Sequence, residues 1–256
     1  MTELARQIRG GDLRRLARAM TAVENRTEEG AAILAELGAL AGQARVAGIT
    51  GPPGAGKSTL IDALARHLRR QSKTVAILAI DPSSRITGGA ILGDRIRMQR
   101  HSGDAGVFIR SVATRGNSGG VAGATAELVR LLDGAGRDAV LVETVGVGQD
   151  ETEIAGLVPV TVVVLAPGMG DEVQTLKAGI MEIADVFAVN KSDLPGADRV
   201  AAEVRGMLDL GTGGDRAMRP AVVRTVASED RGIGELWEAM EKAWAGGRRR
   251  PAPTGD

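Results

Sequence analysis

The chain has 256 residues, in which 32 lysines and arginines balance 32 aspartates and glutamates, and its pI is about 6.8. This balance excludes a general electrostatic attraction to nucleic acid or to an anionic membrane. Because the chain contains no cysteine, it cannot form disulfides or cysteine-based metal sites, and its two histidines are too few for a histidine-built metal centre.

The N-terminus alternates charged and apolar residues and lacks the uninterrupted apolar core of a signal peptide. The longest apolar run, from Val158 to Pro167, falls well short of the roughly 20 residues that a membrane span needs. We therefore expect a soluble cytoplasmic protein with no membrane or nucleic-acid partner. Its length allows one large domain, or one domain with an appendage.

Residues 1–44 predict helices, because apolar residues recur at helical spacing before and after a break at Asn25–Thr27. Thr27 is a candidate cap for the helix that follows. We expect a helical arm here, attached to a main domain over residues 45–245, with a flexible tail over residues 246–256. The arm has two interpretations, a docking arm for a partner or plain core packing, and its sequence fits both.

The stretch Gly51–Thr59 reads GPPGAGKST and directly follows a short apolar run. It fits the phosphate-loop pattern of Gly, four residues, then Gly-Lys-Ser. Glycines let successive backbone N–H groups face an anion, and a helix that begins near Lys57 presents its positive dipole end to the same anion. We expect Lys57 to reach the β- and γ-phosphates of a nucleotide and the Ser58 hydroxyl to bind Mg²⁺. A Gly-rich turn without a ligand is the structural alternative. The predicted phosphate-binding residues are Gly51, Pro52, Pro53, Gly54, Ala55, Gly56, Lys57, Ser58 and Thr59.

From residue 45 onward, short β-branched runs alternate with stretches of helical period. This alternation predicts an α/β fold with a mostly parallel sheet that helices cover on both faces. Such sheets bind ligands at the carboxyl ends of their strands, so polar residues just after each run are candidate site residues. The expected strands are residues 45–50, 74–80, 107–110, 139–143, 160–166, 185–190 and 221–226.

Acidic residues follow two of these runs. Asp81 opens an Asp-Pro-Ser-Ser segment, where an acid can hold Mg²⁺ or orient water, although a simple Asp-Pro turn is the alternative. Glu143 ends the fourth run, and an acid at this position holds Mg²⁺ in phosphate-loop nucleotidases. GTP-binding proteins usually carry Asp here, so Glu143 is a departure from the commonest form. Gly146 and Gln149 follow in a loop that can order with a triphosphate and relax after hydrolysis.

The tetrad Asn190–Asp193, reading NKSD after the sixth run, indicates recognition of guanine. A carboxylate at Asp193 accepts hydrogen bonds from N1–H and the amino group of guanine, whereas adenine would leave it without donors at a cost of ~2–3 kcal/mol. Asn190 either bonds the purine edge or ties neighbouring loops together, and the Lys191 stem can lie along the ring. A polar turn after a buried strand is the alternative. After the seventh run, backbone N–H groups can touch the base oxygen, and these belong to Val226, Ala227 and Ser228.

Together these pieces resemble the MeaB/ArgK-type GTPases, a family of G-protein chaperones for adenosylcobalamin-dependent acyl-CoA mutases such as methylmalonyl-CoA mutase. The resemblance runs from about Gly11 to Trp237. It implies a P-loop NTPase fold of the SIMIBI class of G domains, with about seven mostly parallel strands, flanking helices and an N-terminal helical appendage. The segments that carry the resemblance are GDLRRLARAMTAVEN, GPPGAGKSTL, DPSS with GGAILGDRIRM, RSVATRGNSGGVA, VETVGVGQDE, and PGMGDEVQTLKAGIMEIADVFAVNKSD.

The resemblance also implies roles for individual residues. Asp81 is a candidate for positioning the attacking water, within a catalytic set of Lys57, Asp81 and Glu143. Residues resembling the ligands of Mg²⁺ are Ser58, Asp81, Asp94 and Glu143. The phosphate loop, Asn190, Lys191 and Asp193 would bind GTP or GDP. The family usually carries Ser at the position of Val226, a departure of little cost if the contacts there are made by the backbone.

Three segments resemble nucleotide-dependent switches: residues 81–101, residues 143–153, and Gly168–Gly179, the third of which contacts the mutase in the family. The implied switch and partner residues are Gly146, Gln149, Asp171, Gln174 and Lys177. Relatives continue into a helical dimerisation arm, whereas this chain stops at Asp256, so the resemblance leaves a homodimer open.

The implied function is hydrolysis of Mg-GTP to GDP and phosphate, slow alone and stimulated by a partner, which gates cofactor loading and protects the mutase. Two alternative functions belong to other classes of nucleotide-binding protein. A metallochaperone-type GTPase for another metalloenzyme would carry Cys or His clusters near its loops, and a P-loop kinase of a small molecule would need an acceptor pocket and a lid. Arg110 and Arg115 are candidates for internal arginines that assist phosphoryl transfer, or for packing roles.

Overall fold

The computed structural model describes residues 1–81, 101, 103–113, 120–144, 155–169, 180–211 and 219–246. Its seven strands form one sheet in the order β3-β2-β4-β1-β5-β6-β7, and the pairs β2–β3, β1–β5, β5–β6 and β6–β7 are all parallel. The expected parallel sheet is therefore confirmed. The strands are β1 (Arg45–Thr50), β2 (Val75–Asp81), β3 (Val107–Ala113), β4 (Ala139–Glu143), β5 (Val160–Leu165), β6 (Val186–Val189) and β7 (Ala221–Arg224).

The helices follow the expected periodic stretches, and the helix after the phosphate-loop motif begins at Lys57 as predicted. None of the helices in the described ranges combines the length and apolar character that a membrane span requires. The helices are α1 (Glu3–Arg9), α2 (Leu13–Glu24), α3 (Glu28–Gly38), α4 (Lys57–Arg70), α6 (Gly120–Gly134), α9 (Ile180–Ile183), α10 (Ala197–Gly211) and α11 (Ile233–Gly246), with a short 3₁₀ helix, η3 (Ala227–Glu229).

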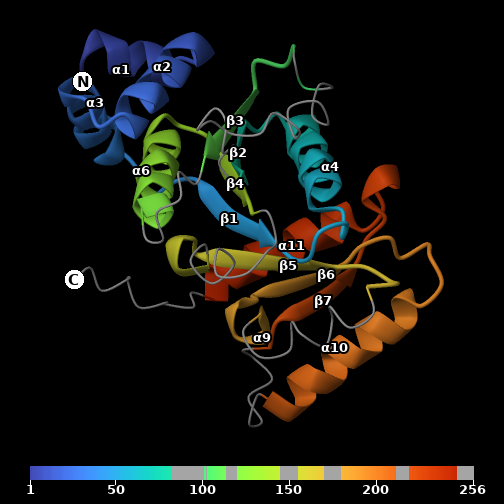
Figure 1. Ribbon diagram of the computed structural model, residues 1–256. Helices are drawn as coiled ribbons and strands as arrows, with labels where there is room; N and C mark the ends of the chain where they lie inside the picture. The colour runs from blue at the N-terminus through green and yellow to red at the C-terminus, as the bar shows by residue number, and fades with distance from the viewer. Residues whose placement is uncertain are drawn as a thin grey trace, which may run out of the picture. The chain divides into compact units, whose positions relative to one another are not determined.

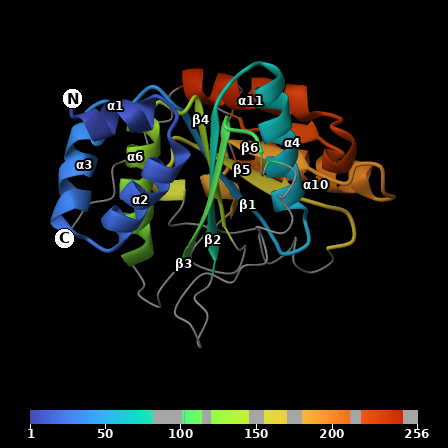
Figure 2. The same cartoon turned by 90° about the horizontal axis from the view of Figure 1, so that it is seen from above.

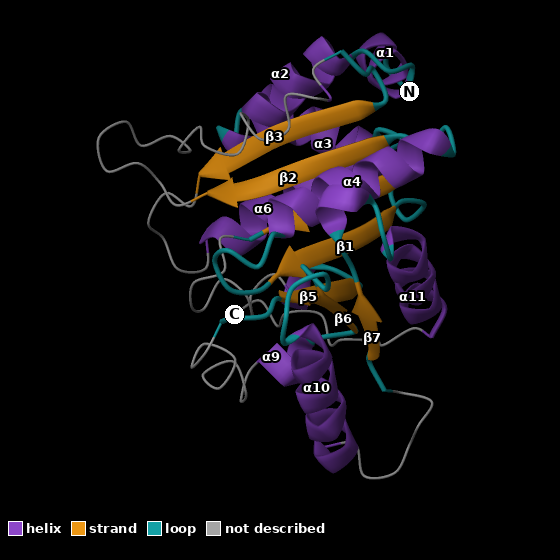
Figure 3. Cartoon of the chain, turned by 90° about the vertical axis from the view of Figure 1, so that its right-hand side faces the viewer, coloured by secondary structure: helices purple, strands orange, loops and turns teal. Residues whose placement is uncertain are grey.

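The contacts divide the chain into two compact units. The first unit comprises Met1–Val46 and Leu68–Val142, and the second comprises Ala47–His67 and Glu143–Asp256. The N-terminal arm thus packs together with part of the main domain. In the first unit, α2 and α3 lie against α6 (Figures 1 and 2), and β2 runs beside β3 (Figure 3).

The arm helices begin where the sequence supplies polar caps. The Asp12 carboxylate accepts the N–H groups of Arg14 and Arg15, and the Thr27 hydroxyl accepts the N–H of Gly30 at 3.0 Å. The predicted cap at Thr27 is therefore confirmed. Since each helix start leaves unpaired N–H groups, these caps stabilise helices that are too short to be stable alone.

Small residues bring the arm close to α6. A Cβ atom at Gly134, the last residue of α6, would lie 1.9 Å from the carbonyl oxygen of Leu37 in α3. Asp133, its neighbour, accepts the N–H groups of Gln43 at 3.1 Å and Ala44 at 2.8 Å, which fixes the connection that leads into β1. Of the two interpretations of the arm, core packing describes these contacts.

Arg110 of β3 binds the arm as well. Its guanidinium donates to the carbonyl oxygen of Ala17 and the hydroxyl of Thr21, both at 3.1 Å, and forms an ion pair with Glu24. All three partners lie on α2. Of the roles suggested by the sequence, Arg110 has the packing role, and Arg115 lies outside the described residues.

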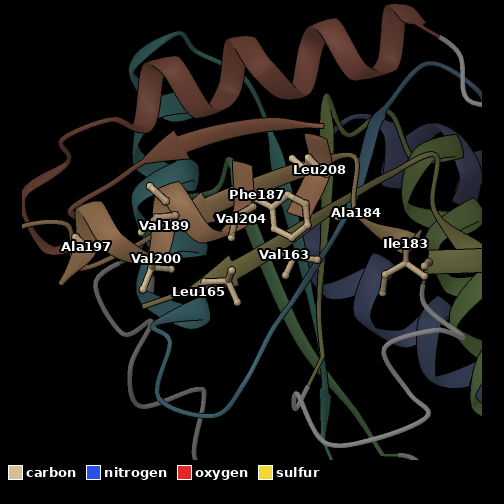
Figure 4. Packing of buried hydrophobic residues seen from close by; sticks show 12 residues of the cluster. Val163, Leu165, Ile183, Ala184, Phe187, Val189, Ala197, Val200, Val204 and Leu208 are labelled. Carbon is tan, nitrogen blue, oxygen red and sulfur yellow. The ribbon is translucent and has the colours of Figure 1, made fainter. Parts of the chain in front are cut away.

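In the second unit, α10 packs on β5 and β6 through a cluster of buried apolar side chains (Figure 4). Phe187 of β6 is 1% exposed and points toward Val204 and Leu208 of α10. All residues of β5 and β6 are buried, the pattern of parallel strands covered on both faces. Burial on both faces explains why the sequences of β5 and β6 are almost entirely apolar.

We predict that Gly134→Ala lowers the free energy of unfolding by about 1–3 kcal/mol, because its new methyl group would overlap the backbone of α3. Gly123→Ala, in the same helix, is the matched control. Apart from its chain neighbours and the nearby backbone of its own helix, no atom of the described residues lies within 4 Å of a Cβ there, so this change should raise stability by about 0.5–1 kcal/mol. Urea unfolding of both variants measures the difference, and equal stability of the two would contradict the close α3–α6 contact.

Candidate functional site

The phosphate-loop motif forms the connection between β1 and α4. Gly51, Gly54 and Gly56 all have positive φ angles, of 134°, 79° and 94°. At Gly51 a Cβ atom would also lie 2.2 Å from the carbonyl oxygen of Val164. Both the backbone conformation and the close approach of β5 therefore require glycine here. The loop then enters the N-terminus of α4, whose first residue is Lys57.

Lys57 lies across the loop that precedes it. Its side chain is buried, and the ammonium group donates to the carbonyl oxygens of Gly51 at 2.7 Å and Pro52 at 3.2 Å. A buried ammonium needs such partners, because its desolvation is costly. The contacts hold a positive charge beside the backbone N–H groups of the loop, which makes this position suited to an anion.

Ser58 and Glu143 meet next to this charge. The Ser58 hydroxyl donates to Oε1 of Glu143 at 2.6 Å, and Glu143 is only 4% exposed. Glu143 is placed by the residue after it, since the N–H of Thr144 donates to the Ile49 carbonyl and its hydroxyl to that of Thr50 at 2.9 Å. A hydroxyl and a carboxylate side by side fit Mg²⁺, which uses hard oxygen ligands and takes one or two carboxylates alongside substrate phosphates.

Asn190 connects three segments through one buried side chain. Its amide Nδ2 donates to the carbonyl oxygen of Ala55 in the phosphate loop at 3.0 Å. Its Oδ1 accepts the hydroxyl of Thr225 at 3.2 Å and the N–H of Ala227 at 3.1 Å. The sequence left Asn190 with two roles, and the structure shows the one in which it ties neighbouring loops together.

Lys191 and Asp193 lie on the exposed side of this connection. Lys191 has a φ angle of 54°, which is uncommon for a residue with a side chain, and its stem approaches the phosphate loop at Gly56. The backbone is held in this turn by Ser192, whose N–H donates to the Thr225 carbonyl at 3.0 Å. Asp193 is exposed at the surface, where a ligand can reach it.

The segment Val226–Arg231, which we call the base loop, is closed by its own backbone. Val226 and Arg231 pair as an antiparallel bridge, with N–H to carbonyl distances of 3.0 and 3.2 Å, and η3 lies between them. Ala227 gives its N–H to Asn190, and Ser228 is exposed next to it. The base loop and the tetrad therefore lie together.

Some predicted site residues are not described. Asp81 is the last residue of β2, one residue beyond the end of the expected strand, and its side chain lies outside the described part of the chain. The remaining metal, switch and partner candidates fall wholly outside the described residues: Asp94, Gly146, Gln149, Asp171, Gln174 and Lys177.

Two sets of contacts around the site could not be predicted from the sequence. One is the pair of buried hydroxyls, Thr50 and Thr144, that places Glu143. The other is Arg66 of α4, which forms ion pairs with Asp62 and with Asp230 of the base loop. The sequence does not show which side chain a threonine or a helical arginine contacts, so these partners were found only in the fold.

Comparisons with known proteins show which family the chain resembles. A family model described as methylmalonyl Co-A mutase-associated GTPase MeaB matches residues 16–249. A Pyrococcus abyssi protein, provisionally named as a GTPase, is 51% identical over 242 residues, which cover 94% of this chain and 75% of the relative. The mouse protein named methylmalonic aciduria type A homolog, mitochondrial, is 42% identical over 198 residues, covering 76% of this chain and 48% of the relative.

A solved structure shares the fold as well. The crystal structure of a protein described as LAO/AO transport system kinase superposes with a TM-score of 0.78 at 31% identity, covering 95% of this chain and 74% of that one. The resemblance seen in the motifs is confirmed by the family match over most of the sequence. The chain belongs to the MeaB family of methylmalonyl Co-A mutase-associated GTPases.

Proposed function

We propose that the site described above binds Mg-GTP and hydrolyses it to GDP and phosphate. The observation that carries this proposal is the joining of a phosphate loop and an Asn-Lys-Ser-Asp tetrad by Asn190. A phosphate loop alone is common to many nucleotidases, whereas the tetrad adds a carboxylate suited to guanine. Asn190 fixes the spacing between the two.

The phosphate half of the site uses groups that are already in place. Lys57 exchanges its contacts with the Gly51 and Pro52 carbonyls for the β- and γ-phosphates, which keeps the buried ammonium paired. Ser58 and Glu143 hold Mg²⁺, which when bound neutralises charge that develops on the phosphoryl oxygens. The N-terminus of α4 directs its N–H groups at the same oxygens.

The base half of the site reads the purine by hydrogen bonding. Asp193 accepts from N1–H and the amino group of guanine, and the exposed Ser228 offers the next backbone donor after Ala227 for the base oxygen. The stem of Lys191 covers one face of the ring. Adenine would leave the Asp193 carboxylate without donors, so selectivity follows from an unmade charged hydrogen bond.

We predict that Asp193→Asn weakens GTP binding by about 100-fold, which corresponds to the loss of ~2–3 kcal/mol. The variant should bind XTP better than the natural protein does, because xanthine carries an oxygen where guanine has an amino group and an Asn amide can donate to it. Displacement of a fluorescent GDP analogue measures both affinities. Asp198→Asn, a change of a neighbouring exposed acid on α10, is the matched control. Unchanged GTP preference in Asp193→Asn would remove Asp193 as the base reader.

We predict that Ser58→Ala abolishes the gain in GTP affinity that Mg²⁺ provides and slows hydrolysis by about 100-fold, since a metal ligand is lost. Affinity for GDP in EDTA should stay within about twofold of the natural protein, because the substitution keeps every backbone N–H of the phosphate loop and the N-terminus of α4. Ser58→Thr keeps the hydroxyl and should keep both properties. A Ser58→Ala protein with full Mg²⁺ dependence would place the metal on other ligands.

We further propose that this GTPase acts as a chaperone of an adenosylcobalamin-dependent acyl-CoA mutase, gating cofactor loading and protecting the enzyme. The family description, which names a mutase-associated GTPase, supports this role, as does the mouse relative named for methylmalonic aciduria. The proposed switch and partner residues, from Gly146 to Lys177, would transmit the state of the nucleotide to the mutase.

Size-exclusion chromatography with purified methylmalonyl-CoA mutase tests this role. We expect a complex whose stability differs between GDP and a non-hydrolysable GTP analogue, and a rate of phosphate release at least about tenfold higher with the mutase. The ethylmalonyl-, isobutyryl- and hydroxyisobutyryl-CoA mutases should be tested in parallel. Failure of all four to bind or to stimulate hydrolysis would contradict the chaperone role, while leaving GTP hydrolysis intact.

One observation favours a second function, since the solved structure at 31% identity is described as a transport system kinase. A kinase would transfer the γ-phosphoryl group to a small molecule, whereas a GTPase releases it to water. Product analysis with γ-labelled GTP in the presence of candidate amino-acid acceptors separates the two. Free phosphate as the sole labelled product supports the GTPase, and label on an acceptor would support the kinase.

A further inference from the structure

Arg66, in the third turn of α4, is held between two carboxylates. It forms an ion pair with Asp62, one turn earlier on the same helix. It also forms an ion pair with Asp230 of the base loop, in which Nη2 donates to Oδ1 at 2.6 Å and Nε donates to the same oxygen at 3.2 Å. Charge-assisted hydrogen bonds are shorter and stronger than neutral ones. Asp62 orients the guanidinium, and Asp230 is the group that it positions.

Asp230 lies at the point where the base loop turns back. Its φ angle is 56°, and it directly follows η3 and precedes Arg231, which closes the loop by pairing with Val226. Gly232, just beyond, has no room for a side chain, since a Cβ atom there would lie 2.1 Å from the Arg224 carbonyl. The backbone on both sides of Asp230 is therefore constrained. A contact that fixes the position of the Asp230 carboxylate thus also fixes the position of the whole base loop.

The base loop is joined to the phosphate loop by two separate routes. Through Asn190, the N–H of Ala227 is linked to the carbonyl of Ala55. Through Asp230 and Arg66, the other end of the loop is linked to α4, the helix that continues the phosphate loop. One connection alone would let the base loop rotate about it, whereas two connections at separate points fix both its distance and its orientation.

We infer that Arg66 and Asp230 are positioning residues for guanine selection, which set the base loop at the correct distance from the phosphate loop. This inference rests on the proposed binding of guanine by Asp193 and the base loop. A hydrogen bond from the loop to the base oxygen needs its donor within a few tenths of an ångström of the right place, so a loop free to shift loses it. Neither residue needs to touch the nucleotide.

The same helix supplies a matched control. Arg69 also donates to an aspartate through Nε and Nη2, with Nε to Oδ2 of Asp104 at 2.8 Å and Nη2 to Oδ1 at 2.9 Å. The two pairs have similar exposure, 27% and 33% for Arg69 and Asp104 against 23% and 27% for Arg66 and Asp230. Hydrogen bonding to Arg69 holds the pKa of Asp104 below its ordinary value. Asp104 precedes β3 and belongs to no predicted site.

The experiment compares Arg66→Met, Arg66→Lys and Arg69→Met by displacement of a fluorescent GDP analogue with GTP and with ATP. We expect Arg66→Met to weaken GTP binding by about tenfold, the equivalent of one hydrogen bond, and to leave ATP binding unchanged. The preference for GTP over ATP then falls about tenfold, KM for GTP rises, and kcat is retained. Arg66→Lys keeps the charge and should recover part of the preference. Arg69→Met should lower the melting temperature by a similar amount and keep the preference of the natural protein.

A preference unchanged in Arg66→Met, with a loss of melting temperature like that of Arg69→Met, would show that the pair is merely structural and overturn the inference. If Arg66→Met does not fold, Asp230→Asn preserves the shape of the loop and is held to the same criteria. Absence of any GTP preference in the natural protein would instead contradict the proposed function itself, so the two failures are distinguishable.

Discussion

The buried amide of Asn190 is the interaction on which the rest of the site depends. It follows the last residue of β6, and its three partners belong to the phosphate loop, to the end of β7 and to the base loop. A polar group buried this deeply must have its hydrogen bonds made, so each partner segment is held where the amide requires it. The phosphate loop, the tetrad and the base loop thus share one reference point, and none of them is positioned independently of the others.

Much of this arrangement could be predicted because its signals are local. The runs that became β1, β4 and β5 are short, β-branched and bounded by polar residues, and the phosphate loop requires glycines at fixed spacing. The roles of long-range partners could not be predicted in the same way. Arg66 and Asp230 are 164 residues apart, and Arg110 and Glu24 are 86 apart, so nothing in the neighbourhood of either residue identifies its partner. Asn190 is an intermediate case. Its place in the tetrad could be read from the sequence, but its hydrogen bonds to three separate segments could be found only in the structure.

The contacts of the arm support core packing, which is one of its two interpretations. Its helices had the spacing of either a docking surface or a core, and a glycine at the end of α6 allows the backbone of α3 to come within contact of it. Arg110 adds polar contacts with α2 at the same time. The arm and α6 therefore form one packed layer in the first unit.

The central claim is that one site holds a triphosphate at Lys57 and distinguishes its base at Asp193. Titration calorimetry of the natural protein with GTP, GDP and ATP, each with Mg²⁺, tests it most directly. The account predicts saturable binding of GTP and GDP with one site per chain, and affinity for ATP weaker by about 100-fold or more. Equal or tighter binding of ATP would contradict it and would leave the chain with a phosphate-binding loop whose base specificity has another origin.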